Sequence, residues 1–138
     1  MGASYIHKCN NCGYSVSTSG PWEFYRGKSG RRKLYGHPSS VSTEAKQYGI
    51  AGLSGKLYCI VCDKVLDLIL VEFEHPSKES VDVWSGRCKP MSKYELPESV
   101  KCRKCGNTEL LLEPFDNSNI SCPRCNKGQL VGNMEWIS

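Results

Sequence analysis

The residues with the clearest chemistry in this sequence are cysteines at a fixed spacing. Eight of the nine cysteines fall into Cys-x-x-Cys pairs. Two thiolates at this spacing can bind one metal ion from a tight turn, and two such turns complete a tetrahedral site. The sequence therefore predicts two four-cysteine metal sites. The four pairs are Cys9/Cys12, Cys59/Cys62, Cys102/Cys105 and Cys122/Cys125.

The residue after each second cysteine suits a tight metal-binding turn, here called a knuckle. These residues are Gly13, Asp63, Gly106 and Asn126. Glycine, asparagine and aspartate adopt left-handed backbone geometry more readily than other residues. Such a turn directs backbone N–H groups at the sulfurs, and these hydrogen bonds steady a thiolate site.

A weak internal repeat indicates which pairs share a metal. Residues 8–13 match residues 101–106, and residues 59–64 match residues 122–127. Each half of the chain thus has a Gly-terminated pair followed by an Asp/Asn-Lys-terminated pair. This order predicts that Cys9/Cys12 pairs with Cys59/Cys62, and Cys102/Cys105 with Cys122/Cys125. The alternative is one cross-braced domain with Cys9/Cys12 beside Cys102/Cys105.

The C-terminal residues 99–138 resemble the zinc-ribbon family, whose rubredoxin-like knuckles lie on β-hairpins and clamp one zinc ion. The resemblance depends on Cys-x-x-Cys-Gly, Cys-Pro-Arg-Cys and the strand after it, with 16 residues between the two pairs. In the first half, 46 residues separate the pairs. We interpret that half as a ribbon with a long insertion, about residues 20–55.

We therefore expect a small, metal-stabilised, mainly β protein with two zinc-ribbon-like modules in tandem. The first module spans 1–84, the linker 85–98 and the second module 99–138. One short helix is expected over 44–48, capped by Ser42 or Thr43 and ended by Gly49. Turns are expected at Gly20-Pro21 and Asp116-Asn117. The expected strands are 14–18, 22–26, 65–73, 81–84, 110–115 and 129–136.

Zinc is the first choice of metal because tetrahedral thiolate sites suit it. The alternative is iron, which would make the chain a rubredoxin-like electron carrier. Four cysteine ligands close a zinc site to water, and no nucleophile or phosphate-binding motif stands out, so we expect no enzyme. Cys88, between Arg87 and Lys89, is expected to be an unpaired linker cysteine rather than a reactive one.

Charge is distributed unevenly along the chain. Residues 1–62 carry eight Lys/Arg and two acids, whereas residues 63–138 carry ten Lys/Arg and twelve acids. Eight thiolates and two Zn²⁺ ions would offset the formal charge of +4 and bring the loaded protein near neutrality. Any polyanion should therefore bind the first half.

The insertion mixes cations and aromatic rings in residues 22–37. Bases stack on aromatic rings and phosphates attract Lys and Arg, so this mixture suits RNA or single-stranded DNA. The same rings would alternatively form the core of a small module. The predicted nucleic-acid contacts are Trp22, Tyr25, Arg26, Lys28, Arg31, Arg32, Lys33 and Tyr35.

The second partner hypothesis is a protein. In it the chain is an adaptor or a small subunit, docking through its acidic C-terminal ribbon or strand 65–73. The paired cysteines, the lack of a secretory signal and the lack of a long apolar run favour a cytoplasmic protein that does not contact membranes.

Overall fold

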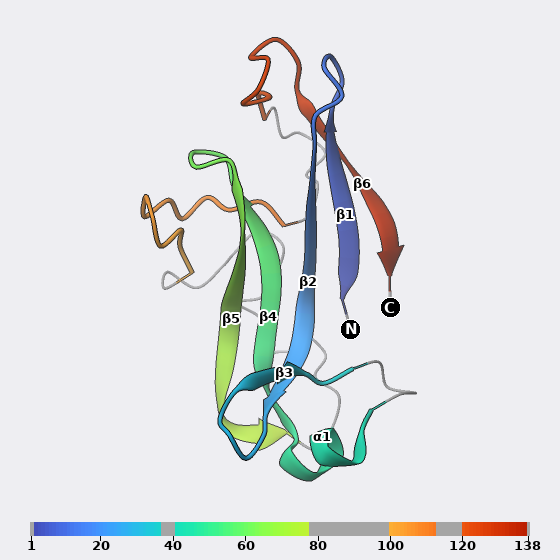
Figure 1. The fold of residues 1–138 in the computed structure, drawn as a ribbon, viewed down its shortest axis with the longest axis vertical. Coiled ribbons are helices and arrows are strands. Elements are labelled where there is room, and N and C mark those ends of the chain that lie inside the picture. The colour runs from blue at the N-terminus through green and yellow to red at the C-terminus, as the bar shows by residue number, and fades with distance from the viewer. Residues whose placement is uncertain (1, 37–40, 78–99, 113–119, 138) are drawn as a thin grey trace.

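One antiparallel sheet of six strands runs through the part of the chain that the structure describes (Figure 1). This computed structural model describes residues 2–36, 41–77, 100–112 and 120–137. The strand order is β5-β4-β2-β1-β6, and β3 pairs with β2. The elements are β1 (Ala3–Cys9), β2 (Ser15–Arg26), β3 (Arg32–Leu34), α1 (Thr43–Tyr48), β4 (Ile50–Cys59), β5 (Lys64–Ser77) and β6 (Leu130–Ile137).

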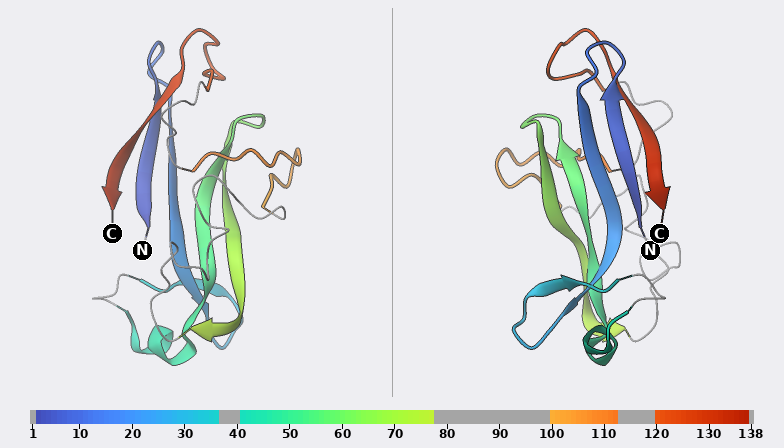
Figure 2. Two further views of the ribbon diagram at one scale, coloured as in Figure 1. Left: turned by 180° about the vertical axis from the view of Figure 1, so that it is seen from behind. Right: turned by 45° about the vertical axis from the view of Figure 1, so that its right-hand side comes forward.

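The mainly β fold is confirmed, but the two predicted modules are not separate. β6, from the predicted second module, pairs with β1 along its whole length, from Ala3 opposite Ile137 to Cys9 opposite Leu130. Both ends of the chain therefore lie side by side at one edge of the sheet (Figures 1 and 2). An isolated hairpin is only marginally stable in water, so the C-terminal strand gains by joining the larger sheet.

The hairpin of β4 and β5 supports the larger hydrophobic core. Its inward-facing leucines, such as Leu57 opposite Leu66, lie on one face of the sheet. The segment 100–112 packs on that face and contributes Val100, Leu110 and Leu112 to the same core. A further antiparallel bridge joins Tyr58 to Leu111, with both N–H···O distances at 2.9 Å.

Local signals in the sequence predicted several elements well. The helix α1 begins after Ser42, whose hydroxyl accepts the N–H of Ala45 at 3.1 Å, and ends at Gly49 with φ 79°. β5 contains the strand expected at 65–73, and β6 covers the strand expected at 129–136 except for Gln129. The sequence interpretation missed β1, β3 and β4.

The expected turn at Gly20-Pro21 is wrong. β2 continues through both residues, and its pairing with β4 shifts register between Ser19 and Trp22. Of the strand expected at 110–115, the described residues show only the bridge at Leu111. The strand 81–84, the linker 85–98 with Cys88, and the turn Asp116-Asn117 lie outside the described residues.

The cysteine loops and the basic insertion lie at opposite ends of the sheet. The loops after β1 and before β6 lie together at the top of Figure 1, and the β4–β5 loop lies at the same end. The β2–β3 hairpin and α1 lie at the bottom, as the other two views also show (Figure 2). The insertion is therefore remote from the cysteines.

Phe24 anchors the end of the sheet that carries the insertion. Its side chain is fully buried, while its cross-strand partner Leu34 is 70% exposed. We expect Phe24→Ala to lower the free energy of unfolding by about 3–5 kcal/mol, the usual cost of removing a buried ring. Leu34→Ala should change it by less than about 0.5 kcal/mol. Urea unfolding of the metal-loaded protein measures both, and equal effects would contradict this packing.

Candidate metal centres

Two clusters of four cysteine sulfurs form the candidate metal centres. Site A consists of Cys9, Cys12, Cys122 and Cys125, and site B of Cys59, Cys62, Cys102 and Cys105. Within each cluster all four sulfurs lie within 4.8 Å of one another. All eight cysteines are free thiols rather than disulfides.

The spacing of the sulfurs matches tetrahedral coordination. In site A the Sγ–Sγ distances are 3.6 Å for Cys9–Cys125 and 3.7 Å for Cys12–Cys122. In site B they are 3.6 Å for Cys59–Cys105 and 3.8 Å for Cys62–Cys102. A Zn–S bond of about 2.3 Å places the sulfurs of a regular tetrahedron about 3.8 Å apart. The donor set therefore fits a thiolate-bound metal ion in both sites, in a zinc-ribbon-like arrangement.

The predicted pairing of the knuckles is wrong. The Cys9/Cys12 knuckle shares site A with Cys122/Cys125, while Cys59/Cys62 shares site B with Cys102/Cys105. The alternative of Cys9/Cys12 beside Cys102/Cys105 is also wrong. One regularity persists, because each site still combines a Gly-terminated knuckle with one terminated by Asp or Asn.

Sheet topology explains this pairing. The β1–β6 ladder ends with Cys9 opposite Leu130, so the loop before β6 lies over the first knuckle. The Tyr58–Leu111 bridge brings the segment 100–112 to the β4–β5 loop. The long sequence separations hardly disfavour these contacts, because each doubling of loop length raises the free-energy cost of closing the loop by only about 0.6 kcal/mol. The 116-residue separation of Cys9 and Cys125 is therefore tolerated.

The left-handed positions predicted after each knuckle are confirmed. The φ angles are 80° at Gly13, 53° at Asp63, 76° at Gly106 and 56° at Asn126. These turns direct N–H groups at the sulfurs. The N–H groups of Asn11 and Cys12 both lie 3.4 Å from Cys9 Sγ.

Further donors to the sulfurs escaped the sequence interpretation. The side-chain amide of Asn11 donates to Cys125 Sγ at 3.6 Å, and that of Asn107 to Cys59 Sγ at 3.7 Å. Gly128 packs so closely that an added Cβ would lie 2.5 Å from Cys9 Sγ. Each of these contacts joins a residue to the opposite knuckle. No local signal could have revealed them without the correct pairing.

Hydrogen bonds stabilise the thiolate form at some cysteines of each site. In site A the backbone N–H of Cys12 is the main cause that lowers the pKa of the Cys9 thiol. The backbone N–H of Lys127 is the main cause that lowers the pKa of the Cys125 thiol to about 5. In site B the backbone N–H of Cys105 is the main cause that lowers the pKa of the Cys102 thiol to about 6. Cys125 and Cys102 are therefore thiolates at neutral pH, ready to bind a cation.

Other thiols in the same clusters shift in the opposite direction. The neighbouring Cys105 thiol, followed by burial, raises the pKa of Cys62 to about 12. For Cys12, the N–H of Tyr14 lowers the pKa, but burial and the other thiols outweigh it and raise the pKa to about 11. Four thiolates this close repel one another without a cation. Metal binding must therefore displace protons from these thiols.

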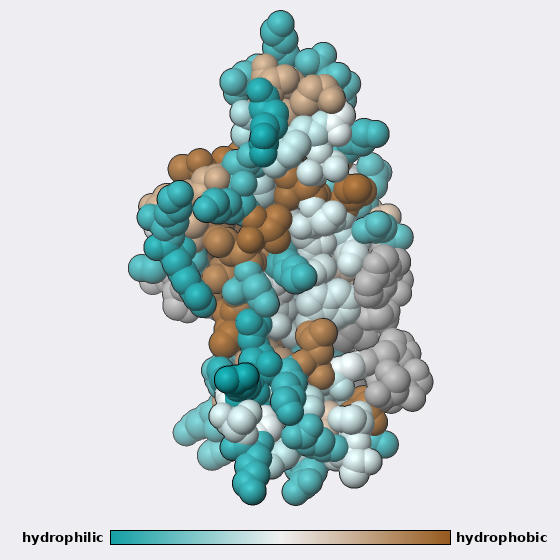
Figure 3. Space-filling model, in the orientation of Figure 1, coloured by the Kyte–Doolittle hydropathy of each residue, from teal (hydrophilic) through white to brown (hydrophobic). Residues whose placement is uncertain are grey.

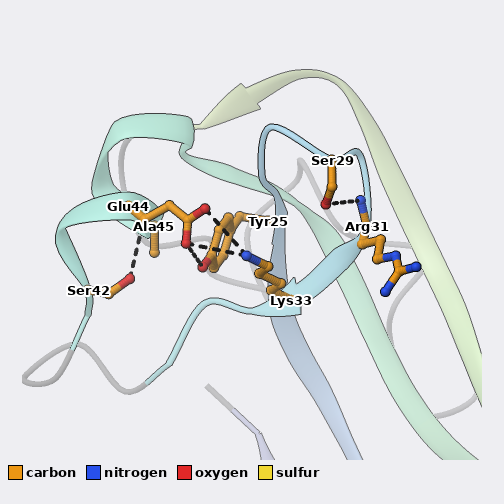
Figure 4. A network of polar contacts seen from close by, with 7 residues as sticks. All are labelled: Tyr25, Ser29, Arg31, Lys33, Ser42, Glu44 and Ala45. Carbon is orange, nitrogen blue, oxygen red and sulfur yellow. Dashed lines mark hydrogen bonds and ion pairs between the residues drawn. The ribbon is translucent and has the colours of Figure 1, made fainter.

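The predicted cations of the insertion mostly form ion pairs within the protein. Arg26 pairs with Glu72 at 2.7 Å, Arg32 with Asp67 at 2.9 Å and Lys33 with Glu44 at 3.4 Å. Lys28 and Arg31 are exposed and form no ion pair with another described residue. In Figure 4 the Arg31 guanidinium points away from the Glu44 network.

The predicted aromatic contacts belong largely to the core. Tyr25 is buried, and its hydroxyl donates to Glu44 at 2.9 Å (Figure 4). Tyr35 packs edge-on against Tyr25, with ring centroids 6.4 Å apart. The Trp22 ring lies against Gly2, and its indole N–H donates to Ser19 at 3.1 Å. The structure therefore does not assemble these rings into an exposed stacking platform.

Comparisons with known proteins leave the family open. The chain matches no protein-family model, and no curated protein or solved structure matches it significantly. Among the described residues, no helix has the length and apolar character needed to cross a membrane. The cysteine clusters therefore carry the functional argument.

Paired cysteine substitutions test the knuckle pairing. Cys12→Ser with Cys125→Ser removes two ligands from site A only, so the chain should retain one metal ion at saturating zinc. Cys12→Ser with Cys62→Ser damages both sites, so retention should fall toward none. Metal content by mass spectrometry under native conditions measures this. If instead the first variant lost both metal ions and the second kept one, Cys9/Cys12 would share a metal with Cys59/Cys62, as the sequence predicts.

Proposed function

We propose that this chain is a non-enzymatic zinc protein in which two structural Zn²⁺ ions hold one β-sheet together. The observation that carries this proposal is the geometry of the two clusters, with four thiols each at near-tetrahedral spacing. Four cysteine ligands leave no coordination position for water or a substrate. Each zinc ion would act as a cross-link between distant parts of the sheet.

The position of the clusters in the core supports a structural role. Cys59 and Cys102 belong to the larger hydrophobic core, and Cys9 and Cys122 to a second one near site A. These four side chains are at most 2% exposed. A metal ion there holds together the surfaces on which the strands pack, and its binding free energy contributes to folding.

Metal removal tests this function. As isolated, the protein should be colourless and contain two zinc ions, whereas iron would give colour and an electron carrier. Excess chelator should abolish cooperative unfolding and the far-ultraviolet circular dichroism of the sheet, because the free energy of zinc binding contributes to folding. Zinc, but not magnesium, should restore both. A sheet that persists without metal would sink the structural role.

A second candidate function is nucleic-acid binding at the β2–β3 hairpin. The observation that favours it is two exposed cations at the hairpin tip, Lys28 and Arg31, neither of which forms an ion pair with another residue that the structure describes. Because the nearby rings are largely buried, such contact would be electrostatic rather than by stacking. Affinity would then depend strongly on salt and little on sequence.

The combined substitution Lys28→Ala and Arg31→Ala tests the second candidate. The log–log salt slope for a single-stranded oligonucleotide should fall by about 1.4, at about 0.7 for each lost phosphate contact. The matched control, Lys56→Ala and Lys64→Ala, removes two exposed cations outside the hairpin. Fluorescence anisotropy over a salt series measures the slope. An unchanged slope rules out the hairpin as the binding surface.

Exposed apolar side chains favour a different role for the chain, docking to another protein. Val61, in the Cys59–Cys62 knuckle, is 68% exposed, and Val65 at the start of β5 is 41% exposed. Figure 3 shows hydrophobic side chains gathered over the middle of one face, with hydrophilic ones toward both ends. A stoichiometric protein that co-purifies without nucleic acid would favour this adaptor role.

A further inference from the structure

One carboxylate connects the two metal sites. Asp63 follows Cys62 of site B, and its Oδ1 accepts hydrogen bonds from the hydroxyls of Tyr14 at 2.7 Å and Tyr58 at 2.8 Å. Its Oδ2 accepts the Nε–H of Arg124 at 3.0 Å. The Asp63 side chain is only 24% exposed. The turn requires only a residue that can adopt left-handed backbone geometry, so these three hydrogen bonds are not needed for the turn itself.

Two of the three donors belong to the knuckles of site A. Tyr14 lies two residues after Cys12, and its carbonyl accepts the backbone N–H of Cys9 at 2.7 Å. Arg124 lies between Cys122 and Cys125, and its backbone N–H points at Cys122 Sγ at 3.4 Å. Residues of both site A knuckles therefore bond to Asp63, which directly follows a site B knuckle.

The donors also fix one another. The Arg124 guanidinium lies over the Tyr14 ring, 4.7 Å from its centroid, in a cation–π contact. Tyr58, which precedes Cys59 of site B, is 1% exposed and packs in the core near site A with Cys9 and Cys122. Asp63 and its three donors therefore form one connected network.

We propose that Asp63 is a positioning residue that couples the two metal sites, so that loading one raises the metal affinity of the other. Metal binding at site A fixes the loops that carry Tyr14 and Arg124, and these side chains then hold Asp63 and the adjoining Cys62 in place. Thermodynamic linkage makes the effect reciprocal. This inference depends on the proposed zinc role, since it concerns how the two ions are taken up.

Asp63→Asn is the sharpest test because site A already has an asparagine at the corresponding position. Asn126 occupies the equivalent left-handed position in site A, at φ 56°, so asparagine preserves the backbone turn. The substitution removes the charge that pairs with Arg124 and weakens the acceptor for two hydroxyls. Tyr14→Phe is a second variant, which keeps the ring under Arg124 and removes only one hydrogen bond.

The experiment is zinc titration of the full chain, read by native mass spectrometry and by competition with a chromophoric chelator. In the unmodified protein a coupling of about tenfold, within the usual range, should lower the one-metal species at half loading to about half of its level for two independent sites. Asp63→Asn should restore the one-metal species toward the independent level, and Tyr14→Phe should do so partly. The control is Asp67→Asn on β5, which breaks the ion pair with Arg32 of β3 and should not change the loading of either site.

A cycle of variants separates coupling from general damage. Disabling site A with Cys12→Ser and Cys125→Ser should weaken zinc at site B about tenfold, but not when combined with Asp63→Asn. Statistical loading of the unmodified protein, or Asp63→Asn that weakens both sites without changing the one-metal species, would overturn the proposal. Two zinc ions bound independently would contradict only the coupling between the sites. Fewer than two bound ions would sink the proposed function itself.

Discussion

The rest of this structure depends on two four-cysteine clusters that join distant parts of the chain. Each cluster brings together knuckles that no local hairpin connects, and four of the eight cysteines lie inside the hydrophobic cores. A sheet of this size on a 138-residue chain has limited apolar surface to bury. Metal coordination would supply bonds at both clusters, and site A lies where strands from the two ends of the chain meet.

The arrangement of the clusters also explains why the sheet is continuous. The segment 100–112 first packs against the β4–β5 hairpin at site B, and the chain then reaches site A before it enters β6. The C-terminal part is therefore bound twice, once on a face of the sheet and once at its edge. Asp63 lies where these two attachments approach each other.

The uneven charge of the chain is used partly inside the molecule. The basic insertion lies beside the acidic strand β5, so Arg26 pairs with Glu72 and Arg32 with Asp67. Both guanidinium groups also lie within 6 Å of the Phe24 ring centroid, at 5.6 and 5.9 Å. Exposed ion pairs of this kind contribute little to stability. They do, however, neutralise two cations that a count along the sequence would make available to bind a polyanion.

The sequence alone determined the features that depend on a few neighbouring residues. The ligand type, the left-handed turns at Gly13, Asp63, Gly106 and Asn126, and the capped helix after Ser42 all follow from local stereochemistry and thiolate chemistry. β5 and β6 followed from their runs of strand-forming residues.

Only the tertiary structure decided which knuckles share a metal and which side chains lie between the sites. Four similar knuckles can pair in more than one way, and loop closure distinguishes those pairings by little free energy. Sheet order and register make the choice, through the β1–β6 ladder and the Tyr58–Leu111 bridge. These contacts also turn Asp63 from a turn residue into a link between the two clusters. The burial of Tyr25 is likewise a tertiary effect, since its ring packs with Tyr35 and Tyr48.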